Sequence, residues 1–99
     1  MFEGSKEEGT EVYKTQSFYI PARMLTALRN YVEKGYPVGH FLYAILTNDF
    51  SEACARGDDE NLRNLPAYAT YLYNEVPSTC YGSKEKVKAH LESLETAVL

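Results

Sequence analysis

Residues 21–35 read PARMLTALRNYVEKG, and this stretch decides the fold class. Its apolar residues recur three to four positions apart, which is the period of one helical face: Met24, Leu25, Leu28, Tyr31 and Val32. Pro21 suits the first turn of a helix, where a missing N–H costs no hydrogen bond. Gly35 is a typical helix stop. The pattern predicts an amphipathic helix over about residues 21–34.

The chain beyond this helix continues in helical patterns. Residues 35–39 contain Gly35, Pro37 and Gly39, which indicates a turn. A second helix is predicted over about residues 38–47, and because residues 41–46 are apolar almost all round it, we expect it to be central and buried. Asp49 followed three residues later by Glu52 is a capping-box pattern, which predicts a short helix that stops at Gly57.

Two further helices are predicted in the C-terminal half. Asp58 is a good N-cap for a helix over about residues 59–75, which Pro66 either kinks or splits. Ser83 caps a last helix over about residues 84–97. Their apolar seams run at helical spacing through Leu62, Leu65, Ala69, Leu72 and Val76, and through Val87, Leu91, Leu94 and Val98. The predicted fold class is all-α, a compact single-domain bundle of four to five helices over residues 17–99.

The first 16 residues differ in character from this helical domain. They are rich in acidic residues and glycine and show no helical apolar period. We interpret residues 1–16 as a polar N-terminal extension. The apolar residues Val12, Tyr13, Phe18 and Tyr19 suggest an extended arm over residues 11–20, which would pack on its own domain or on a neighbouring subunit.

Composition limits the classes of function. The chain of 99 residues has a formal net charge of -4, and its ten Lys and Arg residues are dispersed, so direct nucleic-acid binding is not expected. Its longest apolar run is too short to span a bilayer, and its start lacks a signal peptide, so we expect a cytoplasmic protein without membrane contact. In that compartment Cys54 and Cys80 are expected to be free thiols.

Short motifs in a fixed order connect the chain to a family. The chain resembles a group of small, uncharacterised proteins of phages, prophages and bacteria through the pattern GxPxGxFLxxxLxND followed by LYNxxPxxCYGS, here Gly35 to Asp49 and Leu72 to Ser83. Other matching positions include Ile20, Pro21, Leu28, Ala53, Asp58 and Asn61, and the match covers about residues 19–91. The resemblance implies a helical fold and a phage-linked accessory role, and it carries over no catalytic residue. The acidic extension and Pro66 depart from the pattern.

A candidate ligand site is expected where several turns could meet. The pairs at residues 48–49 and 74–75 sit at predicted helix ends, and with the loop at residues 77–83 they would form a polar pocket rimmed by tyrosines. Gly82, Ser83 and Lys84 open a helix, where free N–H groups attract anions, although an ordinary Ser cap explains them too. The candidate residues for an anion or nucleotide are Tyr36, His40, Asn48, Asp49, Tyr73, Asn74, Thr79, Tyr81, Ser83 and Lys84.

No set of residues makes a convincing catalytic or metal centre. Cys80 is the best nucleophile candidate, because it precedes a helix start, but neither His40 nor His90 stands in a Cys–His signature. His90 is predicted to be solvated in the middle of its helix. The acidic residues 58–60 fit helix capping better than cation binding. We therefore predict a protein that is not an enzyme and holds no metal or cofactor.

The leading functional hypothesis is a phage-type accessory protein that sequesters a small anionic ligand, such as a nucleotide signal, in counter-defence. Tyrosine rings would stack on bases, and the helix start at Ser83 with Lys84 would take phosphate. The alternative is a protein-interaction module that inhibits or adapts a host protein. A small Cys80-dependent enzyme comes third. The two apolar seams could pair within one chain or between chains, so a homo-oligomer is also predicted.

Overall fold

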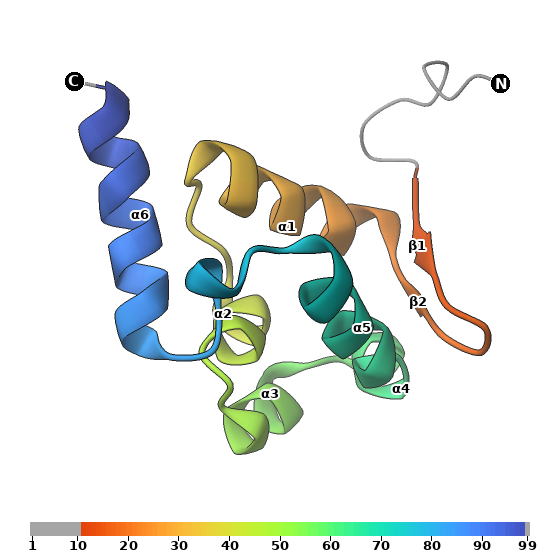
Figure 1. The fold of residues 1–99 in the computed structure, drawn as a ribbon. Coiled ribbons are helices and arrows are strands. Elements are labelled where there is room, and N and C mark those ends of the chain that lie inside the picture. Colours follow the sequence, from red (N-terminus) through yellow and green to blue (C-terminus); the bar gives the residue numbers. More distant parts are fainter. Residues whose placement is uncertain (1–10, 99) are drawn as a thin grey trace, which may run out of the picture.

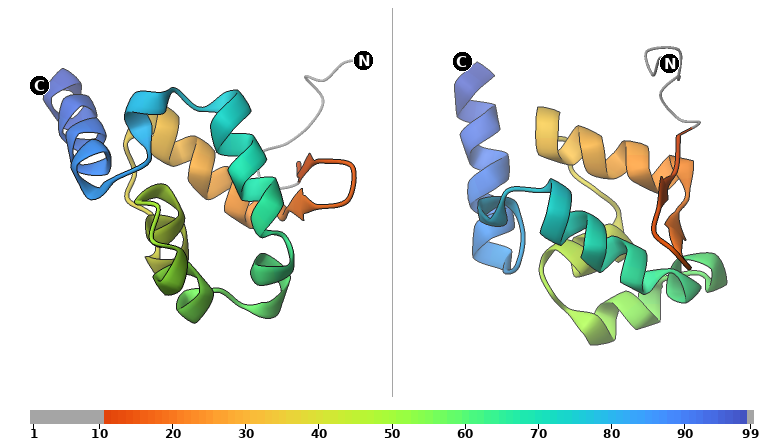
Figure 2. Two further views of the ribbon diagram at one scale, coloured as in Figure 1. Left: turned by 60° about the horizontal axis from the view of Figure 1, so that its bottom comes forward. Right: turned by 45° about the vertical axis from the view of Figure 1, so that its right-hand side comes forward.

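The structure, a computed structural model, describes residues 11–98 of the chain and the side chains of residues 11–94. Its elements in chain order are β1 (Tyr13–Lys14), β2 (Tyr19–Ile20), α1 (Ala22–Lys34), α2 (His40–Leu46), α3 (Phe50–Arg56), α4 (Asp59–Arg63), α5 (Leu65–Glu75), the 3-10 helix η2 (Ser78–Cys80) and α6 (Lys84–Val98). In Figure 1 the β-hairpin stands at one end of the molecule and α6 at the opposite end, with the other helices between them. Both views in Figure 2 keep this arrangement.

The core lies among the helices between these two ends. Its largest fully buried side chains come from nearly every part of the described chain: Ile20, Leu25, Leu28, Tyr31, Leu46, Tyr68 and Val87. The predicted face of α1 supplies three of them, which confirms the interpretation of residues 21–34 as an amphipathic helix. Helix α2 buries Phe41, Leu42, Ala44 and Leu46, so it is central as predicted.

The prediction of a purely all-α bundle of four to five helices needs correction. Within residues 11–98 there are six α-helices and a two-stranded antiparallel sheet, in which Tyr13 pairs with Ile20 and Lys14 with Tyr19. The extra helix arises because the segment predicted over residues 59–75 is split into α4 and α5. Pro66 lies in the first turn of α5, where its missing N–H costs nothing, so the chain restarts a helix instead of kinking one.

The described part of the predicted arm packs on its own domain. The Tyr13 and Tyr71 rings meet edge to face with their centroids 5.0 Å apart. The Glu11 carboxylate accepts two hydrogen bonds from the Arg29 guanidinium, the shorter being 2.6 Å. These contacts attach the hairpin to α1 and α5. Residues 1–10 of the predicted extension lie outside the described residues.

Side-chain caps begin three of the helices as the sequence indicates. Asp49 accepts the backbone N–H of Glu52 at 3.2 Å, and Asp58 accepts that of Asn61 at 2.8 Å. Ser83 Oγ accepts the N–H of Lys86 at 3.1 Å at the start of α6. The capping box is only half formed, because the Glu52 carboxylate accepts from Arg56 Nε instead of turning back to Asp49. In the described part of the chain, no helix has the length and apolar character needed to cross a membrane.

Replacing Gly35 with Ala is expected to lower the free energy of unfolding by about 1–3 kcal/mol. Gly35 ends α1 with φ 73°, and an added Cβ would lie 2.9 Å from Cβ of Leu94 in α6. Gly39→Ala is the matched control, because Gly39 has φ -74° and no atom within 4 Å of an added Cβ. Urea unfolding measures both variants. Equal midpoints for the two would contradict the close packing of α6 on the end of α1.

Candidate functional site

An apolar groove of about 440 Å³ opens between α2–α3 on one side and α5 on the other. Its size falls in the range of small-molecule sites. The lining is dominated by aliphatic and aromatic side chains, with a few polar groups: Ala44, Ile45, Asn48, Asp49, Phe50, Ala53, Leu65, Tyr68, Ala69, Leu72, Tyr73, Tyr81 and Gly82. We call this surface the α2–α5 groove.

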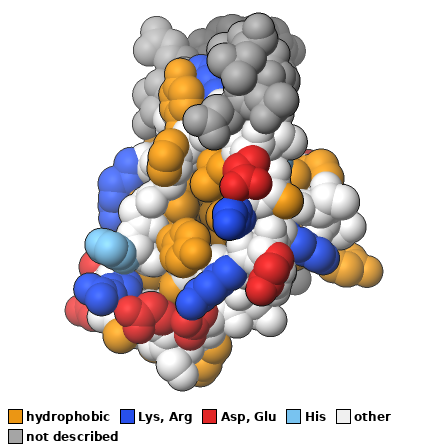
Figure 3. Space-filling view, turned by 90° about the vertical axis from the view of Figure 1, so that its left-hand side faces the viewer, with side chains coloured by type: hydrophobic (Ala, Val, Ile, Leu, Met, Phe, Trp, Pro, Cys, Tyr) orange, Lys and Arg blue, Asp and Glu red, His pale blue; other side chains and the backbone are white. Residues whose placement is uncertain are grey.

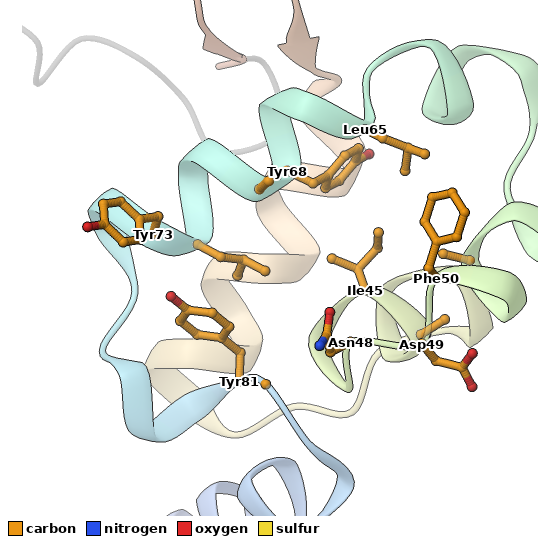
Figure 4. Close-up of a pocket in the computed structure, with 13 residues that line it drawn as sticks. Ile45, Asn48, Asp49, Phe50, Leu65, Tyr68, Tyr73 and Tyr81 are labelled. Atoms are coloured by element: carbon orange, nitrogen blue, oxygen red, sulfur yellow. The ribbon is translucent and has the colours of Figure 1, made fainter.

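Figure 4 shows how the side chains lie around the groove. Ile45 and Phe50 point toward Leu65 and Tyr68 across it, and the ring of Tyr81 enters from the segment that leads to α6. Asn48 points into the space between them, whereas the Asp49 carboxylate points away from it. The groove therefore offers aromatic and aliphatic walls with an amide at one end.

The backbone at Asn48 adopts a conformation that few residues tolerate. Its φ is 63°, in the left-handed region, and Asn48 is the only residue other than glycine with a positive φ among residues 11–98. Asparagine accepts this conformation more readily than most residues. The turn lets the chain leave α2, cap α3 through Asp49 and direct the Asn48 amide toward the groove.

The start of α6 lies beside this groove. The N–H of Gly82 donates to the carbonyl oxygen of Leu46 at 2.7 Å, which joins the loop before α6 to the end of α2. A shallower hollow next to the groove shares part of its lining and adds Ser83 and Lys84; its residues are Thr47, Asn48, Asp49, Phe50, Ser51, Gly82, Ser83, Lys84 and Glu85. By helix geometry the N–H groups of Lys84 and Glu85 have no acceptor within α6. The apolar groove thus continues into a polar hollow at a helix N-terminus.

The structure brings most of the predicted site residues together. Tyr73 and Tyr81 line the groove, Asn48 and Asp49 line both the groove and the polar hollow, and Ser83 and Lys84 line the hollow. His40 lies on the other side of α2, in a small recess shared with Tyr43, Asp49, Glu52 and Lys84. None of these three recesses is lined by Tyr36, Asn74 or Thr79, whose side chains are exposed elsewhere.

Sequence reasoning missed the apolar walls. Leu65, Ala69 and Leu72 belong to the predicted seam of α5, which was assigned to helix packing, and Ile45 belongs to the apolar run of α2. The signal that could have found them is the excess of apolar positions around α2, more than one packing face needs. Phe50 also lines the groove, and its 71% exposure is visible only in the structure.

The prediction that His90 is solvated was wrong. Its Nε2 lies 2.9 Å from the backbone oxygen of Tyr31, and its Nδ1 lies 3.4 Å from Sγ of Cys80. Cys80 is buried, and burial raises the pKa of its thiol. A thiol with a raised pKa and little access to solvent is a poor nucleophile, so the Cys–His pair gives little support to catalysis.

Of the acidic residues at positions 58–60, Asp58 acts as a cap and ion-pair partner and Glu60 as an ion-pair partner. Asp58 caps α4 and lies 3.2 Å from Arg23, and Glu60 accepts a 2.6 Å hydrogen bond from the Tyr19 hydroxyl. That bond and Arg23 lower the pKa of the Glu60 carboxyl. In the part of the chain with described side chains, no group of three His, Cys, Asp or Glu residues is arranged to hold a metal ion.

Charges of both signs are mixed on the face that carries α6. Figure 3 shows Lys and Arg side chains interspersed with Asp and Glu, with apolar surface between them. A surface that binds nucleic acid through its phosphates presents a continuous field of positive charge. The described side chains of this face show no such continuous field.

Comparison of the chain with protein-family models, with curated proteins and with solved structures gives no match. The features of the described structure that bear on function are the α2–α5 groove and the hollow beside it.

Proposed function

We propose that the protein binds a small ligand that combines a flat apolar ring with an anionic group, as a nucleotide does. The observation that carries the proposal is the continuity of two recesses of opposite character. The apolar groove and the polar hollow share Asn48, Asp49, Phe50 and Gly82 in their linings. A ligand that spans both recesses would place its ring against apolar side chains and its charge at the start of α6.

The groove suits the ring of such a ligand. Aromatic side chains at its walls offer stacking and edge-to-face contacts, which favour any base because every base has a π-face. The side chain of Asn48 points into the groove with one donor group and one acceptor group, which can pair with the edge of a ring. Tyr81 lines the groove next to Gly82, which the groove and the hollow share, and its ring could stack on the ring of the ligand.

The hollow suits the anionic group. Lys84 carries a positive charge at the N-terminus of a helix of 15 residues, where the helix dipole also favours an anion. Asp49 and Glu85 line the hollow as well. The Asp49 carboxylate caps α3 by accepting the N–H of Glu52, which draws its charge toward that helix. If the resemblance to phage proteins reflects common function, this binding would sequester a nucleotide signal of host defence.

Nucleoside monophosphates are the probes for this proposal. Added to isotope-labelled protein, they are expected to shift the amide NMR signals of residues 45–50, 65–73 and 81–85 together. Nucleosides and inorganic phosphate, each with half of the recognised chemistry, are expected to bind at least tenfold more weakly. Ala69→Trp fills the groove and Lys84→Glu reverses the charge at the hollow, so each is expected to abolish these shifts.

Two substitutions on the exposed face of α6 serve as matched controls. Ala89→Trp and Lys88→Glu make the same chemical changes at exposed positions that line none of the recesses described above. They are expected to leave binding unchanged. Binding that survives Ala69→Trp and Lys84→Glu, or shifts that appear only at other surfaces, would contradict the proposed site.

A second candidate function is a protein-interaction module, favoured by the exposed aromatic residues around the groove. Phe50 is 71% exposed and Tyr73 is 84% exposed. Exposed aromatic side chains beside an apolar groove are typical of surfaces that receive the apolar face of a partner helix. Under this alternative Phe50→Ala and Tyr73→Ala would abolish capture of a host protein, while no nucleoside monophosphate would shift the groove signals.

A further inference from the structure

We propose that α6 is a hinged helix that opens as a unit, and that a closed cycle of hydrogen bonds through Tyr31, Cys80 and His90 latches it. The three residues come from α1, η2 and α6, so the cycle can close only when α6 is docked. The ligand site proposed above does not need these contacts, and the latch can be tested without any ligand.

The geometry of the cycle fixes the role of each group. Tyr31 Oη donates to the carbonyl oxygen of Cys80 at 2.7 Å. The carbonyl oxygen of Tyr31 can only accept, so His90 Nε2, at 2.9 Å, carries the proton. His90 Nδ1 is then an acceptor, and the Cys80 thiol, at 3.4 Å, donates to it. Each residue both donates and accepts within the cycle, and the two bonds of the His90 ring are the ones that cross from α6 to α1 and η2.

The described side chains of α6 give it a modest apolar attachment. Among its described side chains, residues 84–94, only Val87 is buried, while Leu91 packs against the core in part and Leu94 meets Gly35. The Tyr31 and His90 rings add a tilted contact with centroids 4.8 Å apart. Beside these apolar contacts, α6 is held by the two His90 hydrogen bonds and by the bond from Lys86 Nζ to the carbonyl oxygen of Ser78 at 3.2 Å. Elements held in this way open locally, before the whole domain unfolds.

The hinge lies in the segment just before α6. Gly82 is exposed, has φ 116°, and an added Cβ there would have no neighbour closer than 3.7 Å. The N–H of Gly82 donates a hydrogen bond to the carbonyl oxygen of Leu46, which holds Gly82 on the end of α2. The chain after Gly82 can then turn about this point. Lys84 lies beyond the hinge, so opening would carry it away from the groove. If the proposed function is correct, a bound ligand would hold α6 closed.

Cys80 itself can report the opening. In a Cys54→Ser background it is the only thiol, and it is buried while α6 is docked. Alkylation by iodoacetamide in increasing, non-denaturing urea gives the free energy of opening and its urea dependence. The alkylation rate of the urea-unfolded protein at the same pH corrects for thiol reactivity. We expect opening with a urea dependence well below that of global unfolding.

Two variants test the latch directly. His90→Phe keeps a ring against Tyr31 but removes both imidazole bonds. Tyr31→Phe removes the hydroxyl that donates to the Cys80 carbonyl and leaves His90 Nδ1, which accepts from the thiol, in place. His90→Phe is expected to raise the corrected alkylation rate about tenfold, which corresponds to about 1.4 kcal/mol. Tyr31→Phe is expected to raise it by a smaller factor, because its bond joins α1 to η2 and does not cross to α6. Lys88→Ala, on the exposed face of α6, is expected to have no effect. Alkylation that occurs only through global unfolding, or rates unchanged in both latch variants, would overturn the proposal whether or not the groove binds a nucleotide.

Discussion

Raising the pH from about 9 to about 12 is expected to destabilise the fold strongly, because buried tyrosines must ionise. Burial raises the pKa of Tyr31 to about 12, from an ordinary value near 10. Burial also raises the pKa values of Tyr68 and Tyr71. The unfolded chain therefore loses these protons at lower pH than the folded chain does. The contribution of these protonated tyrosines to the free energy of unfolding is complete below about pH 10 and is lost as the pH rises toward about 12. Tyr31 alone accounts for about 2–3 kcal/mol of this loss.

Urea unfolding at a series of alkaline pH values measures this loss, and Tyr31→Phe is the variant that isolates one contribution. It removes the ionisable hydroxyl, so its free energy of unfolding is expected to fall less steeply between about pH 10 and 12. Tyr73→Phe is the control, because Tyr73 is 84% exposed. A Tyr31→Phe profile parallel to that of the unchanged protein would contradict the role of burial at this position.

Tyr68→Phe is expected to lower the free energy of unfolding near neutral pH by about 1–3 kcal/mol. The Tyr68 hydroxyl donates a 2.6 Å hydrogen bond to Oδ1 of Asn61, and both residues are buried. Phenylalanine preserves the edge-to-face contact with Phe41 but leaves the Asn61 oxygen without this donor. A buried acceptor without a partner costs more than the average hydrogen bond contributes.

The matched control for Tyr68→Phe is Tyr43→Phe, because Tyr43 is 40% exposed on α2. That change is expected to shift the urea midpoint little. The double variant Tyr68→Phe, Asn61→Leu removes both partners and is expected to recover part of the loss. Equal stabilities for the unchanged protein and Tyr68→Phe would contradict the account of this bond.

Local rules in the sequence predicted most of the helices. Apolar spacing and caps gave α1 almost to the residue, and Asp49, Asp58 and Ser83 begin the helices that they were expected to begin. The hairpin was not predicted, because strands of two residues each are too short to show an alternating pattern. The sequence did not decide whether Pro66 kinks one helix or separates two, because that choice depends on the tertiary contacts of the residues around it.

The site was less accessible from the sequence, because its parts are distant along the chain. Asn48, Tyr81 and Lys84 were singled out from their turns, but the apolar wall that joins them appears only once α5 lies across from α2. The same limit explains His90. Its spacing on α6 says nothing of Tyr31 or Cys80, which lie 59 and 10 positions away in the chain.

Native mass spectrometry of protein freshly purified from cells tests the central claim, that the α2–α5 groove is a ligand site. The unchanged protein and Ala69→Trp are prepared in parallel, without added ligand. The account predicts extra mass of the size of a nucleotide on the unchanged protein and its absence from Ala69→Trp, with fragmentation identifying the molecule. The same mass distribution for both proteins, whether bare or loaded, would contradict a ligand held in the groove.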